Sequence, residues 1–156
     1  MWTCEDCPMS TQDIVIRPAH DLDRDHVWPL VRDFADSYVA NEDSFRTGFG
    51  ELTVRSDTLV LVAELEADII GYLLASYHGT FFANGSVVWI EEVMVTESAR
   101  DMGIGRSLMN HAEEWAASIP VTYVSLASRR SGDFYRKLGY VDSATYFKKD
   151  SAAIAS

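Results

Sequence analysis

Cysteine, basic side chains and long apolar runs are all scarce in this 156-residue chain. The two cysteines, Cys4 and Cys7, form one C-x-x-C pair, and no second pair or H-x-x-x-H follows. Because a structural zinc site needs four ligands, we expect no metal and read the pair as reduced thiols. No apolar run approaches the ~20 residues that span a bilayer, and the N-terminus lacks a basic and apolar leader. We therefore expect no membrane partner and a cytoplasmic location.

Basic residues are outnumbered, with 13 Lys and Arg against 24 Asp and Glu and a net charge of −11. This shortage speaks against nucleic acid as a partner, because neutralising phosphates requires Lys and Arg on one face. An acidic field attracts a cationic small molecule or a basic peptide end, but acidity also simply keeps a protein soluble. Both interpretations stay open on charge alone.

Neither a repeat nor a low-complexity linker divides the chain, which predicts one folded domain. We expect a flexible arm over residues 1–12, a single domain over 13–149 and a disordered tail over 150–156. Period-2 patterns and turn signals predict strands at 14–18, 58–64, 69–77, 87–95, 121–127 and 140–147. Helical spacing predicts helices from about 26 to 40 and at 43–55, 102–118 and 132–138.

The first helix contains Pro29, which fits best in a first turn and so places the helix start near His26. The order of all the elements is typical of an α/β (α+β) fold. We expect a mixed, mostly antiparallel central sheet with helices on both faces.

The junction between the strand at 87–95 and the helix at 102–118 carries the pattern Arg-x-x-Gly-x-Gly, at Arg100, Gly103 and Gly105. Glycines let the backbone approach a ligand, and the N–H groups of a first helical turn point at an anion. A diphosphate is the expected guest. Dinucleotide and Walker A patterns both fail here, the first because its third glycine position is Leu108. A helix start without a ligand is the alternative.

A second motif, F-Y-R-K-L-G-Y, occupies residues 134–140. The two motifs in this order, over residues 89–140, resemble the GNAT superfamily of N-acetyltransferases. The resemblance implies that acetyl-CoA is the cosubstrate, its pyrophosphate held by the loop and its pantetheine arm paired along the preceding strand. The cofactor-binding residues so implied are Met94, Val95, Arg100, Asp101, Met102, Gly103, Ile104, Gly105, Arg106, Ser107, Ser128, Phe134 and Tyr135. Ser128 stands near the place where the family often keeps an asparagine.

Two carboxylates, Glu91 and Glu92, lie on the strand that leads into the loop. An alkyl ammonium must lose a proton before it attacks a thioester, and a carboxyl in partly apolar surroundings has a raised pKa that suits a base. Successive strand residues point to opposite faces, so only one of the two is expected to face the cleft. Members resembling this pattern place an acidic residue four positions before Val95, so Glu91 is the expected base, with Glu92 second. The alternative is a structural ion pair with a core Arg or His.

Tyr135 falls where the resemblance implies a tyrosine near the thioester sulfur, and it is the expected acid; the alternative is a core tyrosine. The leading hypothesis is acetyl transfer to a primary amine of a small cationic molecule by direct attack. A protein or peptide N-acetyltransferase and a non-catalytic acyl-CoA sensor are the alternatives. Oligomeric state stays open, and a homodimer built through the last strand and tail is common among proteins that resemble this one.

Overall fold

The computed structural model describes residues 14–35 and 38–154. The arm predicted over residues 1–12, with Cys4 and Cys7, lies outside these described residues. The chain forms two compact units, residues 1–126 and residues 127–156.

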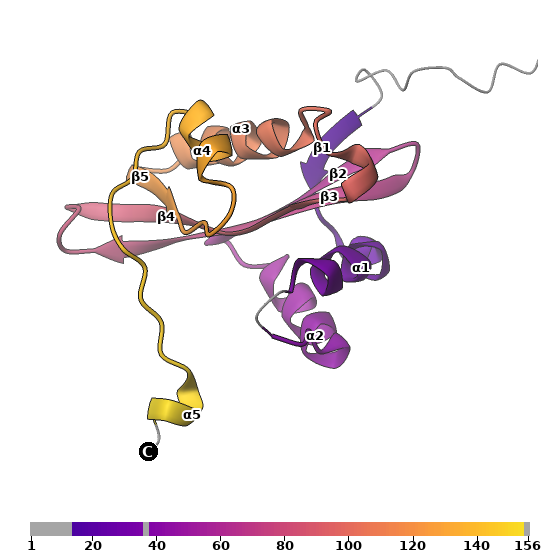
Figure 1. Ribbon diagram of the computed structural model, residues 1–156, viewed down its shortest axis with the longest axis horizontal. Helices are drawn as coiled ribbons and strands as arrows, with labels where there is room; N and C mark the ends of the chain where they lie inside the picture. Colours follow the sequence, from indigo (N-terminus) through magenta and orange to yellow (C-terminus); the bar gives the residue numbers. More distant parts are fainter. Residues whose placement is uncertain (1–13, 36–37, 155–156) are drawn as a thin grey trace, which may run out of the picture. The chain divides into compact units, whose positions relative to one another are not determined.

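The first unit is a five-stranded sheet with helices on both faces (Figure 1). Its strands are β1 (Ile14–Pro18), β2 (Thr58–Leu65), β3 (Asp68–Thr80), β4 (Gly85–Val95) and β5 (Val121–Leu126). Its helical segments are η2 (Asp21–Asp23), α1 (Arg24–Phe34), α2 (Glu42–Leu52), η3 (Glu97–Ala99) and α3 (Ile104–Ala117). Figure 1 shows α1 and α2 on one face of the sheet and α3 on the other.

The strands lie in sequence order, β1-β2-β3-β4-β5. Pairing is antiparallel from β1 to β4, and β4 pairs with β5 in parallel. The parallel pair follows from α3, which carries the chain back to the start of β4, so that Val121 at the start of β5 lies opposite Ser86. The predicted mixed, mostly antiparallel sheet is therefore confirmed.

Apolar side chains cover both faces of the sheet. Toward α1 and α2 the buried cluster consists of Val27, Leu30, Phe49, Val60, Val62 and Tyr72. Toward the opposite helix the buried stripe of α3 consists of Ile104, Leu108, Met109, Ala112 and Ala116. The central strands are thus buried on both sides, as their nearly continuous apolar sequences predict.

The first helix begins earlier than Pro29 predicts. It starts at Arg24, and Pro29 lies inside it, in the second turn. Pro29 is exposed, so the carbonyl four residues before it, which has no N–H partner in the helix, faces water. The predicted start near His26 is wrong because a solvent-facing position tolerates the missing hydrogen bond.

The second unit contains α4 (Gly132–Lys137) and α5 (Ser151–Ile154). The strand predicted over residues 140–147 is wrong, since this segment has no regular secondary structure and its side chains from Val141 to Phe147 are exposed. A strand is stable only beside a hydrogen-bonding neighbour, and the second unit has no other strand among its described residues. The alternating pattern alone does not supply that neighbour.

The turn between β2 and β3 offers a first prediction. Its central residues, Glu66 and Ala67, have φ of +50° and +71°, a conformation that strains any side chain with a Cβ. Ala67→Gly should raise the free energy of unfolding by about 0.5–1 kcal/mol, the relieved strain less the extra chain entropy of glycine. The same change at the exposed helical Ala117 should lower it by about 1 kcal/mol. Chemical denaturation of both variants checks the pair, and a loss of stability in Ala67→Gly would contradict it.

Candidate active site

A β-bulge interrupts β4 at Glu91. Ala75 on β3 lies opposite Ile90, and its neighbour Leu74 lies opposite Glu92, which leaves Glu91 as an extra residue between two successive pairs. A bulge resets the alternation of side chains and bends the strand that contains it.

The bulge brings both carboxylates to the face that α1 and α2 cover. The hydroxyl of Tyr72, a member of the buried cluster on that face, donates to Glu92 Oε2 at 2.6 Å. Glu91 accepts a hydrogen bond from the Trp89 side chain. Trp89 lies opposite Ser76, which is four residues from Tyr72 and so shares its face. The expectation that only one glutamate faces the cleft assumes a regular alternation of side chains, which the bulge interrupts at this point.

The surroundings of the Glu91 side chain, which is exposed, raise its pKa. Partial desolvation raises the pKa of Glu91, and the negative charge of Glu92 raises it further. The hydrogen bond from Trp89 and the nearby His78 lower it, but the net pKa remains above the usual value. A carboxylate with a raised pKa is better able to accept a proton from an ammonium group.

Beyond the bulge, β4 separates from β5 and presents a free edge. Pairing with β5 ends at Ile90 opposite Leu126. From Glu91 to Val95 the strand pairs with β3, and no other described strand of the first unit pairs with its second edge. Backbone groups along this edge, including those of Met94 and Val95, can therefore bind an extended amide-bearing chain as an added strand.

The loop after β4 turns sharply before α3. Arg100 is extended and its Nε donates to the Val95 carbonyl at 3.4 Å, whereas Asp101 and Gly103 have φ of +65° and +81°. A Cβ built on Gly103 would meet no atom within 4 Å, so its exposed side borders unfilled space. Glycine suits this position both for its positive φ and for the room it leaves beside the backbone.

The first turn of α3 directs unpaired amides toward the loop. The first helical bond runs from the Ser107 N–H to the Gly103 carbonyl at 3.0 Å. The N–H groups of Ile104, Gly105 and Arg106 precede it and have no acceptor inside the helix. Together with the helix dipole, they form a site suited to an anion such as a diphosphate.

A cleft of about 790 Å³ lies between α1, the end of β4 and the loop. The residues that line it are Leu30, Asp33, Met94, Thr96, Glu97, Ser98 and Arg100. Met94 is two residues after Glu92 and so shares its face of the sheet. The cleft therefore lies along the end of β4 beyond Glu92, and its size suits a small molecule.

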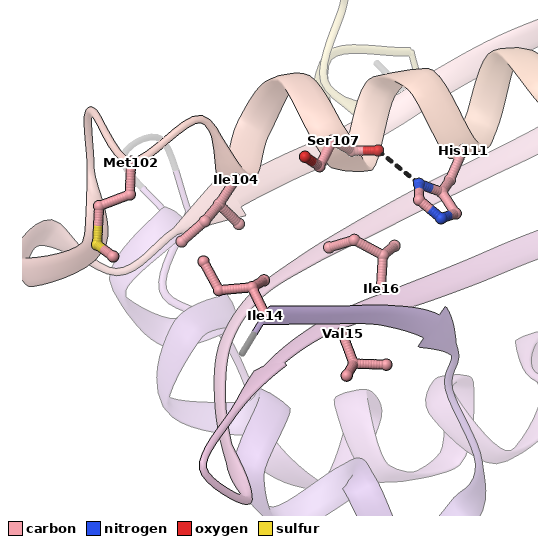
Figure 2. A pocket seen from close by; sticks show the side chains of 7 residues that line it. All are labelled: Ile14, Val15, Ile16, Met102, Ile104, Ser107 and His111. Carbon is pink, nitrogen blue, oxygen red and sulfur yellow. Dashed lines mark hydrogen bonds between the residues drawn. The ribbon is translucent and has the colours of Figure 1, made fainter. Parts of the chain in front are cut away.

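A second, smaller hollow of about 370 Å³ lies on the opposite face, between β1 and α3 (Figure 2). Figure 2 shows Ile14 and Ile16 pointing toward α3 and Val15 pointing away. The His111 ring nitrogen Nδ1 lies 2.8 Å from the Ser107 carbonyl, which ties the imidazole to its own helix. The remaining lining residues are Met102 and Ile104. This hollow contains no carboxylate, so it lacks the acid–base groups of the cleft.

The other predicted site residues lie in the second unit. The ring of Tyr135 packs edge-on against Phe134 and Tyr140, with centroids 5.0 and 6.0 Å apart. Burial raises the pKa of Tyr135, so its phenol is protonated at neutral pH. The Ser128 hydroxyl accepts from the Ser131 N–H at 3.0 Å. The structure thus groups the glutamates with the loop in one unit, and Ser128 with the aromatic pair in the other.

Comparison with known proteins decides the family. The sequence model of the Acetyltransferase (GNAT) family matches residues 20–140, which include every element from η2 to α4. The chain belongs to this acetyltransferase family. The β-bulge, the free edge of β4 and the glycine loop of this GNAT acetyltransferase all lie within the matched range.

Its relatives agree with this membership. An uncharacterized N-acetyltransferase of Bacillus subtilis (strain 168), YhdJ, is 27% identical over 104 residues, which cover 64% of this chain and 73% of the relative. The structure of glucosamine-6-phosphate N-acetyltransferase from Arabidopsis thaliana is similar with a TM-score of 0.79 and 20% identity, covering 88% of this chain and 98% of that one. The aminoglycoside N-acetyltransferase AAC(6′)-Iy in complex with CoA gives 0.72 and 15%, covering 87% and 94%. At these identities the two structures show the shared fold.

The structure adds two residues to this GNAT site that the sequence patterns do not reveal. Tyr72 reads as one more apolar residue of a buried strand, and its contact with Glu92 spans 20 positions of sequence. Asp33 lies among the polar residues of α1 and reaches the cleft only because of how that helix packs. No local sequence signal marks either one.

Neither a metal site nor a membrane helix is found within residues 14–35 and 38–154. These residues contain no group of three or more His, Cys, Asp or Glu arranged to hold a metal ion. None of their helices is both long and apolar enough to cross a bilayer.

Proposed function

We propose that this GNAT protein transfers the acetyl group of acetyl-CoA to a primary amine of a small cationic molecule by direct attack. The observation that carries the proposal is the course of β4. This one strand presents two carboxylates at its bulge, a free backbone edge beyond it, and an anion-binding loop at its end.

The residues of this strand and loop fit acetyl-CoA. The amides from Arg100 to Gly105, with Arg106 and Ser107 completing the first turn of α3, suit the pyrophosphate. The edge at Met94 and Val95 suits the amides of the pantetheine arm. Ser128 and Phe134 are the further contacts proposed from the second unit. The bound cosubstrate supplies an acetyl group activated as a thioester.

Glu91 is the proposed base. It takes a proton from the acceptor's ammonium group, and the freed nitrogen lone pair forms the new N–C bond to the acetyl carbonyl carbon. The nitrogen of the resulting tetrahedral intermediate still carries one proton more than an amide does. As the C–S bond breaks, the Tyr135 hydroxyl gives its proton to the departing thiolate, the nitrogen releases its excess proton to solvent, and the tyrosinate is reprotonated from solvent. Glu92 is the second candidate for the base. Backbone N–H groups near Met94 and Val95 are available to the carbonyl oxygen as it gains negative charge.

The charge of the cleft supports a cationic acceptor. Asp33 and Glu97 line it together with one cation, Arg100, and Glu92 adjoins it. The whole chain has a net charge of −11. Two proteins with a similar fold are, by name, acetyltransferases of amine-bearing small molecules, a sugar phosphate and aminoglycosides. This acidic lining suits an alkylammonium group.

A panel of amines tests this function. Purified protein is given acetyl-CoA with a polyamine, an aminoglycoside, a neutral amino acid or a peptide with a free N-terminus, and thiol release is followed. We expect the highest kcat/KM with one of the two polycations. A higher value for the peptide would favour the protein acetyltransferase alternative. Binding of acetyl-CoA without thiol release from any amine would favour the sensor.

A further inference from the structure

The contact between Tyr72 and Glu92 is a polar contact at the edge of an apolar core. Tyr72 is only 2% exposed and belongs to the cluster formed by α1, α2, β2 and β3. Its hydroxyl donates to Glu92 Oε2 at 2.6 Å, the length of a charge-assisted hydrogen bond. A buried hydroxyl needs an acceptor, and Glu92 is the one it has.

This hydrogen bond favours one protonation state of each partner. A carboxylate that accepts a hydrogen bond is stabilised in its ionised form. Burial, followed by the charge of Glu92, raises the pKa of Tyr72, so the phenol stays protonated and keeps donating. The bulge places the Glu91 carboxyl on the same face as this fixed anion.

We propose that Tyr72 is a positioning residue for the transfer reaction, which holds Glu92 as a fixed anion beside Glu91 and so keeps Glu91 the group that takes the proton. The inference rests on the proposed function, in which Glu91 is the base. Without Tyr72, the Glu92 carboxylate would lose the hydrogen bond that holds it, and its charge would no longer act on Glu91 from a fixed place. The division of roles between the two glutamates would then be lost.

Few other charges face this pair. His78 on β3 lowers the pKa of Glu91 from the same face. From α1, which covers this face, Asp33 lines the adjoining cleft, and the loop contributes Glu97 and Arg100 to it. The part of α2 in the buried cluster is aromatic or aliphatic. A pH experiment therefore has to separate the effect of the His78 imidazole on Glu91 from the effect of Glu92.

The sign of the effect follows from the charges. A fixed negative Glu92 opposes ionisation of Glu91 and places the acid limb of kcat/KM at higher pH. In Tyr72→Phe, the Glu92 side chain loses the hydrogen bond that holds it in place, so its negative charge acts less strongly on Glu91. The acid limb should move to lower pH by about 0.5–1 unit, the size of one charge about 4–6 Å away in the nearly aqueous dielectric of an exposed site. Glu92→Gln should move it the same way.

The experiment measures kcat/KM against pH with the best amine of the panel for the wild type, Tyr72→Phe, Glu92→Gln, the double variant and His78→Gln. We expect the larger shift in Glu92→Gln, a shift of the same sign in Tyr72→Phe, and no shift in the double variant beyond that of Glu92→Gln, since both changes act on one interaction. The His78→Gln profile separates the contribution of the imidazole. A Tyr72→Phe acid limb that stays at the wild-type pH, even with lowered stability, would overturn the positioning role.

Measuring Glu91→Gln alongside separates a failure of the proposed base from a failure of the positioning role of Tyr72. If it abolishes the acid limb, the proposed base stands, and the Tyr72→Phe profile then decides the positioning role by itself. If Glu91→Gln keeps both full rate and limb, the proposed function fails at its base and the inference about Tyr72 is overturned with it.

Discussion

Glu91→Gln should lower kcat by about 10²–10⁴-fold, the usual contribution of a general base. The amide is nearly the same size as the carboxyl and can still accept a hydrogen bond from Trp89, so the bulge should persist. It cannot take a proton from the acceptor's ammonium group. The KM for acetyl-CoA should change little, because the loop and the strand edge that we propose for it are intact. Steady-state kinetics with both substrates varied checks the expectation.

The same variant should also change how the rate depends on pH. Desolvation and the charge of Glu92 raise the pKa of Glu91, so the wild-type rate should fall as pH falls through that raised value. The residual rate of Glu91→Gln should lack this limb. Glu51→Gln, on the exposed side of α2, is the matched control and should keep the wild-type profile. Loss of turnover in Glu92→Gln with full turnover in Glu91→Gln would contradict the assignment and make Glu92 the base.

Asp23→Ala should lower the free energy of unfolding by about 2–4 kcal/mol, since it breaks a buried and hydrogen-bonded ion pair. Asp23 is 4% exposed and accepts from Arg17 at 2.7 and 2.8 Å and from the His20 N–H at 2.9 Å. Arg17 keeps a second partner, Glu64 at 2.8 Å, which limits the loss. These bonds join β1 to the start of α1. Denaturant unfolding measures the change.

The contribution of Asp23 should also disappear in acid. Burial opposes its ionisation, but the hydrogen bonds from Arg17 and the His20 amide more than offset burial and hold the pKa of Asp23 below its usual value. Its stabilisation is therefore present above the unfolded pKa of about 3.9 and is lost as pH falls below it. The gap in stability between wild type and Asp23→Ala should shrink from pH 6 to pH 3. A constant gap would contradict the ionic account, and Asp57→Ala, at the surface pair with Arg55, should have little effect at either pH.

Much of the sheet can be predicted from the sequence because its central strands and α3 bury long apolar patterns. The segment at 58–64 is confirmed as β2 to within a residue, and the helix expected at 102–118 is α3 over a slightly shorter range. A buried strand or helix needs apolar residues at a fixed spacing, and that spacing can be read directly from the local sequence. The missing strand at 140–147 shows the limit, because pairing needs a partner that an alternating pattern does not specify.

The arrangement of the two glutamates could not be predicted from local sequence patterns. Their spacing marks a pair of carboxylates on a strand, but their common face depends on the register between β3 and β4, where one extra residue enters the ladder. Register is a long-range property, set by which apolar residues of two strands meet. The contact of Tyr72 with Glu92 depends on the same register. The glycine loop, in contrast, is a local pattern, and its positive φ at Gly103 agrees with the need for glycine there.

Thermal unfolding with and without acetyl-CoA tests most directly whether the loop before α3 binds the cosubstrate. At about a hundred times its dissociation constant, a ligand of the folded state adds roughly 2.7 kcal/mol, or about 5–10 °C for a chain of this size. Gly103→Val places a β-branched side chain at φ +81° in the space proposed for the pyrophosphate. Gly48→Ala is the control, because Gly48 lies in α2, away from that space, and a Cβ there meets no atom within 4 Å. We predict that the wild type and Gly48→Ala gain this shift and that Gly103→Val does not. No shift in the wild type, or an equal shift in Gly103→Val, would contradict the site.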